Sequence, residues 1–448
     1  MTDVSMADIL FSREERVRIQ GEISKRFSCP IISFTMNIAG PKKNSSLIAR
    51  AFSLGIKSLD AAIDSKKILY KHIDKASPTG PLAIFAVNEN SHKLKEICTE
   101  IEEKNAIGRL FDMDVIDESL NKIEREHERC CIICGAAGRT CAAGRLHPLD
   151  EITAKMKQIM TDALLDHDAS RIAEIASQSL INEVKTTPKP GLVDMRNNGS
   201  HKDMSMVTFE RSAVALTGYF KDCVLIGNLL ASVEYNELFL ALRNAGIKAE
   251  ECMYKATNGV NTHKGAIYSF GILCSAIGRI WSPDKCSPDI NSILDEAANI
   301  AKTAIEVDLS KVVGTTAGER MYLERGNLGI RGEAASGFTS VRNISLPIYK
   351  EMISNGISSN DAGVISLLNL IANIEDSTIY NRGGFEAVDF ARHYAHDLLK
   401  NNRLPSIADI EEMDDVFIKK NLSAGGSADL LAVTYFLYET EKNCDEQI

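Results

Sequence analysis

The sequence predicts two domains, an N-terminal α+β domain over residues 1–150 and an all-α domain over residues 155–448. The chain has 448 residues, of which 44% are hydrophobic and 25% charged, and this length exceeds what one ordinary core holds. Strand and helix patterns alternate before residue 151, whereas helical periodicity dominates after it. The two parts also differ in net charge, because the excess of acidic residues lies after residue 150. Residues 1–150 hold 22 Lys and Arg against 21 Asp and Glu, and the remainder holds 29 against 40.

The N-terminal elements follow from the spacing of apolar residues. Residues 30–38 and 81–87 are short apolar runs beginning at a proline, and each predicts a strand. Apolar residues recur every three or four positions over 47–63 and again over 94–101, which predicts two helices. A third strand is expected over 110–116. These elements together predict a mixed sheet-and-helix domain.

The chain after residue 150 reads as helices separated by polar loops that contain glycine. Apolar stripes at helical spacing cover 152–164 and 172–181, and the most apolar helix is expected over 266–280. The intervening loops are TTPKPGLVDMRNNGSHKD, NGVNTHKG, GIRGEAASG, YNRGG and SAGGSAD. This pattern predicts an all-helical domain whose chemistry lies at helix ends.

Composition excludes several classes of protein. The excess of acid in the second part disfavours a nucleic-acid-binding surface, and no apolar run reaches the roughly 20 residues that span a bilayer. Eleven cysteines without an export signal predict free thiols in a reducing compartment. No Walker A or GxGxxG sequence occurs. We therefore expect a cytoplasmic protein that binds neither nucleic acid nor membrane.

Two acidic residues stand out on the third predicted strand. Asp112 and Asp114 are two positions apart, so their side chains share one face of a strand and could hold Mg²⁺ against a polyphosphate. A solvent-facing strand that carries acids is the alternative. Lys43 follows the first strand in the turn GPKKNS, where it either faces phosphates or lies in a solvated turn.

A group of potential metal ligands ends the first domain. Cys131, Cys134, Cys141 and His147 have the spacing C-x2-C-x6-C-x5-H, which resembles a compact zinc site. Ordinary buried thiols are the alternative interpretation of the same cysteines.

The long polar loop of the second domain carries several charged groups. Ser200 and Asp203 have capping-box spacing, which would make Ser200 the N-cap of a helix. Capping does not explain the density of charged and imidazole groups around them, which are Lys189, Asp194, Arg196, His201 and Lys202.

Two further loops precede predicted helices. Residues 261–265 (NTHKG) open the most apolar helix, where free N–H groups and Lys264 would seat a phosphate. An ordinary cap is the alternative there, and residues 425–429 (GGSAD) admit the same two interpretations. The segments 331–333 (RGE) and 382–384 (RGG) add charged groups beside flexible backbone.

These motifs resemble two enzyme families in one chain. TTPKPGLVD, NNGSHKDM, GVNTHKGAIYSFGILCSAIGR, TAGER, RGEAASG, RGG and GGSADLL resemble triphosphoribosyl-dephospho-CoA synthase over roughly 155–448. SREER, ISFTMNIAGPKKNS, GRLFDMDV and the Cys/His spacing resemble apo-citrate lyase phosphoribosyl-dephospho-CoA transferase. The chain departs from the first family at 376–378, where DST replaces DTN, and from the second at 127–130, where HERC replaces PPRR.

The resemblance implies a bifunctional transferase. The C-terminal domain would join ATP to 3′-dephospho-CoA, forming 2′-(5″-triphosphoribosyl)-3′-dephospho-CoA and releasing adenine. The N-terminal domain, by nucleotidyltransferase-type chemistry, would transfer this group to a serine of the citrate lyase acyl carrier protein (the gamma subunit) and release pyrophosphate. The alternatives are the equivalent maturation of malonate decarboxylase, or a synthase fused to a non-catalytic carrier-docking module.

The residue chemistry suits both steps, with Mg²⁺ as cofactor and zinc as a further candidate. In the transferase domain, Asp112 and Asp114 would carry Mg²⁺ while Lys43 and Arg109 neutralise phosphate charge. In the synthase domain, breaking an N-glycosidic bond needs carboxylates for base or metal roles, for which the candidates are Asp194, Asp203 and Glu333. The candidates for binding phosphates and nucleotide there are Lys189, His201, Lys202, His263, Lys264, Arg331 and Arg382.

Overall fold

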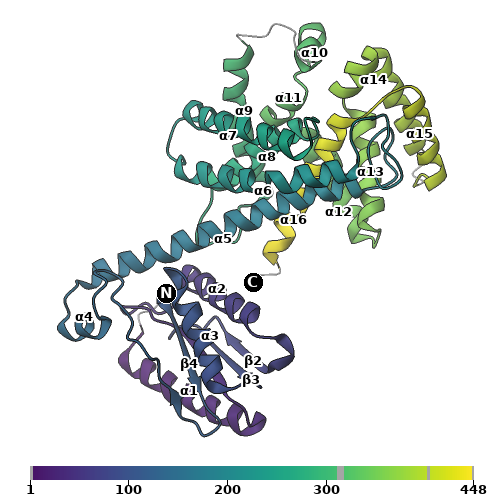
Figure 1. The fold of residues 1–448 in the computed structure, drawn as a ribbon. Helices are drawn as coiled ribbons and strands as arrows, with labels where there is room; N and C mark the ends of the chain where they lie inside the picture. Colours follow the sequence, from purple (N-terminus) through teal and green to yellow (C-terminus); the bar gives the residue numbers. More distant parts are fainter. Residues whose placement is uncertain (1–3, 310–316, 401–403, 446–448) are drawn as a thin grey trace. The chain divides into compact units, whose positions relative to one another are not determined.

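The structure is a computed structural model that describes residues 4–309, 317–400 and 404–445 (Figure 1). Contacts divide the chain into two compact units. Unit 1 comprises residues 1–167 and 283–285, and unit 2 comprises residues 168–282 and 286–448. The long helix α5 (Leu149–Lys185) contributes residues to both units. Thr316, the first residue of the TAGER motif, lies outside the described residues.

Unit 1 is built on a five-stranded antiparallel sheet with the strand order β2-β3-β1-β4-β5. The strands are β1 (Ile31–Met36), β2 (Ile68–Asp74), β3 (Leu82–Val87), β4 (Phe111–Ile116) and β5 (Lys122–Ile123). The three predicted strands are therefore confirmed as β1, β3 and β4. Strand β2 was not predicted, because its side chains alternate between half-buried and exposed at the sheet edge.

Helices cover both faces of this sheet. The longer helices are α1 (Met6–Phe27), α2 (Ser46–Ala62) and α3 (Ser91–Glu103), and the short helical segments are η1 (Ser65–Lys67), η2 (Ile107–Leu110) and α4 (Gly138–Gly144). On one face, the Phe34 ring packs 4.5 Å from Phe52 of α2 and 5.3 Å from Phe111 of β4, measured between ring centroids. On the other face, Ile23 of α1 packs with Ile31 and neighbouring strand residues. The predicted α+β class is confirmed for this unit.

The strand register places the two acidic residues together. Asp112 pairs with Thr35 and Asp114 pairs with Ser33, and paired residues of an antiparallel sheet project to the same face. Both aspartates are partly exposed, whereas Phe111 and its alternate neighbours on β4 are buried. The predicted sharing of one face is therefore confirmed.

Within the residues that the structure describes, all regular secondary structure of unit 2 is helical. Its helices after α5 are α6 (Met206–Leu229), α7 (Tyr235–Ala256), α8 (Lys264–Arg279), α9 (Ile290–Leu309), α10 (Ala317–Arg325), α11 (Ile330–Ala335), the π-helix η3 (Val341–Ser345), α12 (Leu346–Ser354), α13 (Ser359–Asn373), α14 (Ser377–Leu399), α15 (Ile407–Lys419) and α16 (Gly425–Asp445). The all-α prediction is thus confirmed for this part of the chain.

Helix α8 runs through the core of unit 2, with most of its residues buried. It crosses α6 closely because glycines lie at the crossing. A Cβ added at Gly278 would lie 1.9 Å from the carbonyl oxygen of Val224, and one at Gly227 would lie 2.1 Å from that of Ser275. Side chains at either position would force the helices apart. This crossing fixes the direction in which the N-terminus of α8 points.

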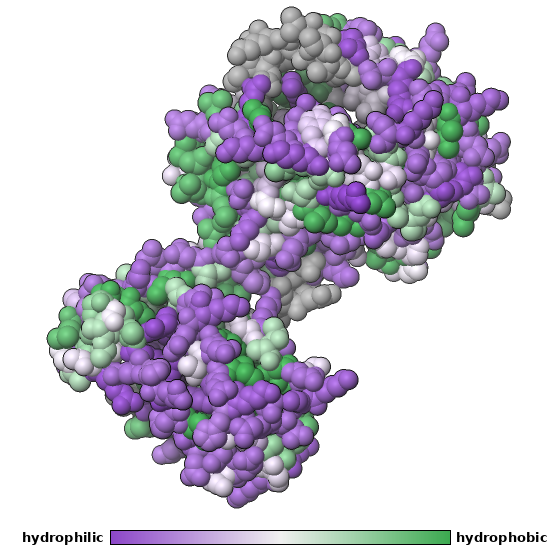
Figure 2. All heavy atoms as spheres, in the orientation of Figure 1, coloured by the Kyte–Doolittle hydropathy of each residue, from purple (hydrophilic) through white to green (hydrophobic). Residues whose placement is uncertain are grey.

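In the part of the chain that the structure describes, no helix is both long and apolar enough to cross a membrane. Hydrophilic side chains predominate on the face shown in Figure 2. Hydrophobic surface gathers around α4, where Leu146 and Leu149 are exposed by 60% and 53%.

Candidate active sites

Unit 2 contains a cavity of about 320 Å³ at the N-terminal ends of three helices, α8, α14 and α16. Basic and imidazole side chains converge on it, namely Lys189, His201, His263, Lys264 and Arg382. Two carboxylates, Glu183 and Asp429, lie in the same lining. Sequence analysis selected the five basic and imidazole groups but neither of these acids.

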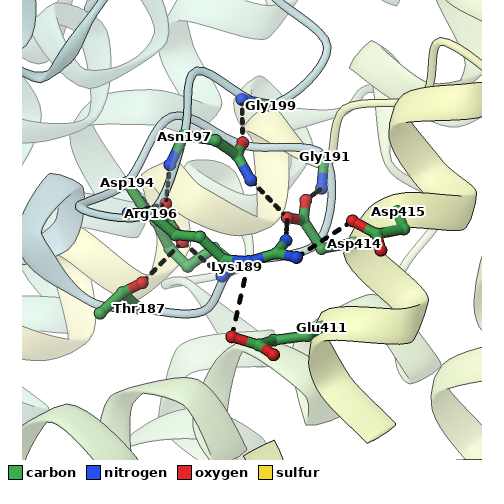
Figure 3. Close-up of polar contacts among 10 residues, drawn as sticks. All are labelled: Thr187, Lys189, Gly191, Asp194, Arg196, Asn197, Gly199, Glu411, Asp414 and Asp415. Atoms are coloured by element: carbon green, nitrogen blue, oxygen red, sulfur yellow. Dashed lines mark hydrogen bonds and ion pairs between the residues drawn. The ribbon is translucent and has the colours of Figure 1, made fainter. Parts of the chain in front are cut away.

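The loop between α5 and α6 supplies Lys189 and His201 to the cavity, and it is organised around Asp194 (Figure 3). Asp194 Oδ2 accepts hydrogen bonds from Thr187 Oγ1 and the backbone N–H of Lys189, both at 2.9 Å. Its Oδ1 accepts from the backbone N–H groups of Arg196 and Asn197, at 2.7 and 3.0 Å. Asp194 is buried and does not line the cavity. Its carboxylate therefore holds the loop in shape.

A second buried carboxylate, Asp414 of α15, anchors this loop to the rest of unit 2 (Figure 3). It accepts hydrogen bonds from the backbone N–H of Gly191 at 2.8 Å and from Asn197 Nδ2 at 2.7 Å, and it pairs with Arg196. Gly191 has φ +68°, and a Cβ there would lie 2.2 Å from the carbonyl oxygen of Leu422. Only glycine fits this position.

Ser200 does not act as the predicted N-cap. Helix α6 begins at Met206 with Ser205 as its N-cap, so the capping-box interpretation of Ser200 and Asp203 is wrong. Ser200 Oγ instead donates to the carbonyl oxygen of Leu422 at 2.6 Å. Its hydroxyl fastens the loop to the segment before α16, because the loop continues past Asp203 before helical geometry begins.

Lys189 and Glu183 form a buried ion pair on the cavity wall. Lys189 Nζ donates to the Glu183 carboxylate and, at 2.7 Å, to its backbone carbonyl oxygen. Burial raises the pKa of Glu183, and the Lys189 charge opposes this rise. The Lys189 ammonium and the Glu183 carboxylate therefore both line the cavity in which a ligand would bind.

His263, the N-cap residue of α8, is buried and neutral. Burial and the Lys189 charge lower its pKa to about 3. Ser212 Oγ lies 2.7 Å from His263 Nδ1 and accepts a hydrogen bond from Thr262 Oγ1 at 2.8 Å. Nε2 has no partner among the described residues, and the side chain lines the cavity.

His201 and Arg382 lie together on another part of the wall. His201 Nε2 is 2.9 Å from Ser423 Oγ, and burial together with the Arg382 charge lowers its pKa. Arg382 Nη1 donates to the carbonyl oxygens of Ser200 and Asn421 at 3.0 and 3.2 Å. These bonds hold the guanidinium at the cavity, where it carries the positive charge that a neutral His201 lacks.

The starts of α8 and α16 differ in how their N–H groups are satisfied. No side chain among the described residues caps α8, and Gly265 and Lys264 line the cavity there. At α16, Asp376 accepts from Ser427 N at 2.7 Å and Thr378 Oγ1 accepts from Gly425 N at 2.7 Å. The α8 start is therefore better suited to an anionic ligand, whereas α16 is capped by groups from the start of α14.

The other predicted residues of unit 2 lie outside the cavity lining. Lys202 and Asp203 are exposed on the loop, although the Asp203 charge acts on both His201 and Arg382. Arg331 is half-buried in α11. Glu333 accepts from Ser340 N at 3.1 Å and from its hydroxyl at 2.5 Å, so it holds the turn that follows α11.

Unit 1 contains a larger cavity of about 640 Å³ whose lining includes Asp112 and Asp114. Asp114 pairs with Lys122 Nζ at 2.7 Å, and Asp112 lies 3.3 Å from Arg129 Nη2. Arg109 also lines the cavity and donates to the backbone carbonyl of Cys130. The cavity thus combines two carboxylates with several cations.

Lys43 does not join this lining. Its Nζ donates to the carbonyl oxygen of Ile38 at 2.5 Å, and burial lowers its pKa. Arg125 and Arg129, which the sequence analysis did not select, lie in the lining and pair with the buried Glu102 at 3.4 and 2.5 Å. Glu102 also accepts a hydrogen bond from the backbone N–H of Met113 at 2.7 Å. It therefore satisfies a backbone donor of β4 and holds Arg125 and Arg129 in place.

The four candidate zinc ligands converge in unit 1. The ligand atoms of Cys131, Cys134, Cys141 and His147 all lie within 4.8 Å of one another. Cys134 Sγ is 3.4 Å from both Cys141 Sγ and His147 Nε2. Tetrahedral zinc with Zn–S bonds of about 2.3 Å places its ligand atoms roughly 3.8 Å apart, so the cluster is close to the required size. His147 Nδ1 lies 3.7 Å from Glu151 Oε2, so a carboxylate is near the ring nitrogen that a zinc ion bound at Nε2 would leave free.

Comparisons with known proteins define the class of enzyme. Residues 169–447 match the family model of ATP:dephospho-CoA triphosphoribosyl transferase, and residues 4–163 match that of apo-citrate lyase phosphoribosyl-dephospho-CoA transferase. The chain belongs to these two families, with the apo-citrate lyase transferase part N-terminal to the triphosphoribosyl transferase part. It is a bifunctional transferase that synthesises the citrate lyase prosthetic group.

Two relatives align with nearly the whole chain, and a third aligns with about two thirds of it. Protein CitXG of Haemophilus influenzae is 33% identical over 98% of this chain and 97% of its own length. Protein CitXG of Leuconostoc mesenteroides subsp. cremoris is 31% identical over 97% of both chains. A 2-(5″-triphosphoribosyl)-3′-dephosphocoenzyme-A synthase of Haemophilus ducreyi is 38% identical, covering 68% of this chain and 98% of its own.

Proposed function

We propose that the unit 2 cavity forms 2′-(5″-triphosphoribosyl)-3′-dephospho-CoA from ATP and 3′-dephospho-CoA, with release of adenine. The observation that supports this most strongly is the convergence of cations, two carboxylates and the uncapped start of α8 on one cavity. Both substrates carry phosphates, and the reaction needs acid or base groups at a ribose carbon. One cavity offers both kinds of group.

Within this cavity, Arg382, Lys264 and the first N–H groups of α8 bind the triphosphate. Lys264 is 3.0 Å from Glu250 and its side chain is largely exposed, so it can exchange this partner for a phosphate. The neutral imidazoles of His201 and His263 donate hydrogen bonds without adding charge. Lys189, fixed by Glu183, supplies a buried positive charge.

The carboxylates chosen from the sequence support the cavity from outside its lining. Asp194 is a positioning residue, because it holds the loop that presents Lys189 and His201. Asp203 stabilises the charge of Arg382 electrostatically. Glu333 and Arg331 act through the turn and helix that contain them.

The unit 1 cavity transfers the phosphoribosyl-dephospho-CoA group to a serine hydroxyl, with pyrophosphate as the leaving group. Asp112 and Asp114 would hold Mg²⁺, which fits their shared strand face, their partial exposure and their place in the lining. When bound, the metal neutralises charge on the reacting phosphates. Arg109, Lys122 and Arg129 bind and orient the phosphate oxygens.

The Cys131, Cys134, Cys141 and His147 cluster binds a structural zinc ion, as its ligand set and size suggest. All four protein ligands close a tetrahedral site, so the ion orders the segment between β5 and α5. Metal analysis of the purified protein should find one zinc per chain, decreasing in the Cys134→Ser variant. A zinc content well below one per chain would contradict this assignment.

The acceptor of the second step is the acyl carrier protein of citrate lyase, as the matching transferase family implies. The test is to incubate the full chain with ATP, 3′-dephospho-CoA, Mg²⁺ and apo-carrier, and to weigh the carrier by mass spectrometry. The carrier should gain the mass of one phosphoribosyl-dephospho-CoA group while adenine accumulates. A carrier of unchanged mass, or labelling of a malonate decarboxylase carrier alone, would contradict the proposal.

A further inference from the structure

Asp429 is the fifth residue of α16, near the N-terminus of this helix, and lines the unit 2 cavity. Among the residues that the structure describes, it has neither a hydrogen-bond donor nor a cationic partner at its carboxylate. Burial and the nearby charges of Glu183 and Asp376 raise its pKa well above that of an ordinary aspartate. Such surroundings favour a carboxyl group that carries a proton.

The second carboxylate of the cavity has different surroundings. Glu183 is paired with Lys189, whose Nζ also donates to the Glu183 backbone carbonyl at 2.7 Å. The adjacent ammonium favours the ionised form of Glu183, whereas no cation of the described part of the chain pairs with Asp429. Two carboxyl groups in one cavity are thereby separated into one that can donate a proton and one that can accept it.

The position of Asp429 is fixed by close packing. A Cβ added at Gly265, in the first turn of α8, would lie 2.0 Å from Asp429 Oδ2. The carboxyl group therefore lies directly against the helix start assigned above to the phosphates. Gly426 and Ser427 pack on Asp376, which places the first turn of α16 and so Asp429 itself.

On the basis of the synthase reaction proposed above, we propose that Asp429 is the catalytic acid that protonates the departing adenine and that Glu183 accepts the proton of the attacking hydroxyl. The bond from ribose C1″ to adenine N9 breaks, and its electron pair stays on the purine. The Asp429 proton passes to a purine nitrogen, so that neutral adenine leaves. The 2′-hydroxyl oxygen of dephospho-CoA forms the new bond to C1″ and gives its proton to Glu183. Exchange with water then restores both carboxyl groups.

The experiment compares nucleotides whose bases differ in their need for protonation. The full-length wild type and Asp429→Asn are assayed for release of the base from ATP, 7-methyl-ATP and 6-chloropurine riboside triphosphate, each with dephospho-CoA. 7-Methyladenine leaves as a neutral base without gaining a proton. We expect Asp429→Asn to lower release from ATP about 100-fold or more, and release from the activated nucleotides less than tenfold.

Controls separate this assignment from the proposed function. Glu412→Gln, which replaces an exposed carboxylate on α15, should match the wild type on all three nucleotides. Asp429→Ser also removes the acid, with a smaller side chain, and should show the same selective loss if Asp429→Asn does not fold. Equal losses on ATP and the activated nucleotides, or no loss on ATP, would overturn the role of Asp429. Failure of the wild type to release adenine from ATP would instead overturn the proposed function.

Discussion

At the scale of single residues, the same side-chain type has different tasks in the two units. Asp112 and Asp114 remain accessible on β4 and face cations that a metal or phosphate can replace. Asp194 and Asp414 are buried and accept backbone hydrogen bonds, so they maintain a loop. The two pairs of aspartates differ in solvent accessibility and in the kind of group they contact, and both differences are consequences of the fold.

Replacing Asp112 and Asp114 together by asparagine should leave adenine release unchanged and lower loading of the carrier protein at least about 100-fold. The amides keep the size of the side chains but are poor ligands for Mg²⁺. Adenine is measured by chromatography and loading by mass spectrometry. Glu118→Gln, an exposed acid just after β4, is the matched control and should load normally. Undiminished loading by the double variant would rule out the metal assignment.

His263 should make the stability of unit 2 depend on pH. Its pKa is about 3 in the folded protein, against an unfolded value near 6.5, so the unfolded chain binds the extra proton. Stability is therefore fully present above pH 6.5 and falls as the pH decreases towards 3, by up to about 1.4 kcal/mol per pH unit.

Denaturant unfolding followed by the fluorescence of Trp281, the one tryptophan of the chain, measures this dependence in unit 2. His263→Gln should flatten the decrease between pH 7 and 5, whereas His396→Gln, at an exposed position of α14, should retain it. An identical slope in wild type and His263→Gln would show that His263 is not the group responsible.

At the scale of elements, hydrophobic periodicity located some helices and strands and missed others. It located β1, β3, β4, α2 and α3, because their apolar residues recur at strand or helix spacing. It missed α1, which is rich in charged residues and packs only a narrow stripe on the sheet. It also missed β2, where alternation is between polar and moderately apolar residues.

Site residues were predictable where they lie in a polar motif that stands out from the surrounding sequence. Lys189, His201 and Arg382 come from conspicuous polar loops, and the structure places them in one cavity. Glu183 and Asp429 lie within helices, where an acid is indistinguishable from a solvent-facing residue. Their importance depends on α5 and α16 meeting at the start of α8, which no local pattern reveals.

The close crossing of α6 and α8 gives a prediction for an element. Gly278→Ala should destabilise unit 2 by about 1–3 kcal/mol, because the new methyl group meets the Val224 carbonyl. Gly218→Ala in α6, where a Cβ meets nothing within 4 Å, should instead stabilise the helix by roughly 0.5–1 kcal/mol. Denaturant unfolding monitored by Trp281 compares the two, and a stabilised Gly278→Ala variant would contradict the crossing.

At the scale of the whole molecule, each unit has its own core and its own cavity. The two chemical steps should therefore be separable within one chain. A variant damaged in one cavity should retain the other step, because the residues of each lining come from one unit only.

Mixing two defective proteins tests this independence. The Asp112→Asn/Asp114→Asn variant makes the intermediate but cannot transfer it, and Asp429→Asn has the opposite defect. Each alone should load little carrier, whereas their mixture should restore loading to at least about half the wild-type rate at saturating concentrations. Carrier mass is the measurement. A mixture as inactive as its components would show that one change had disabled both steps.

Asp376 has a consequence for how related sequences can diverge. Its two carboxylate oxygens serve the starts of α14 and α16 together, and the Thr378 hydroxyl bridges the same two helices. Substitution at one of these positions alone would leave backbone N–H groups at the start of the other helix without their hydrogen-bond acceptor. Substitutions at positions 376, 378 and 425–427 should therefore occur together in related sequences. The replacement of DTN by DST keeps an oxygen atom that can bridge the two helices.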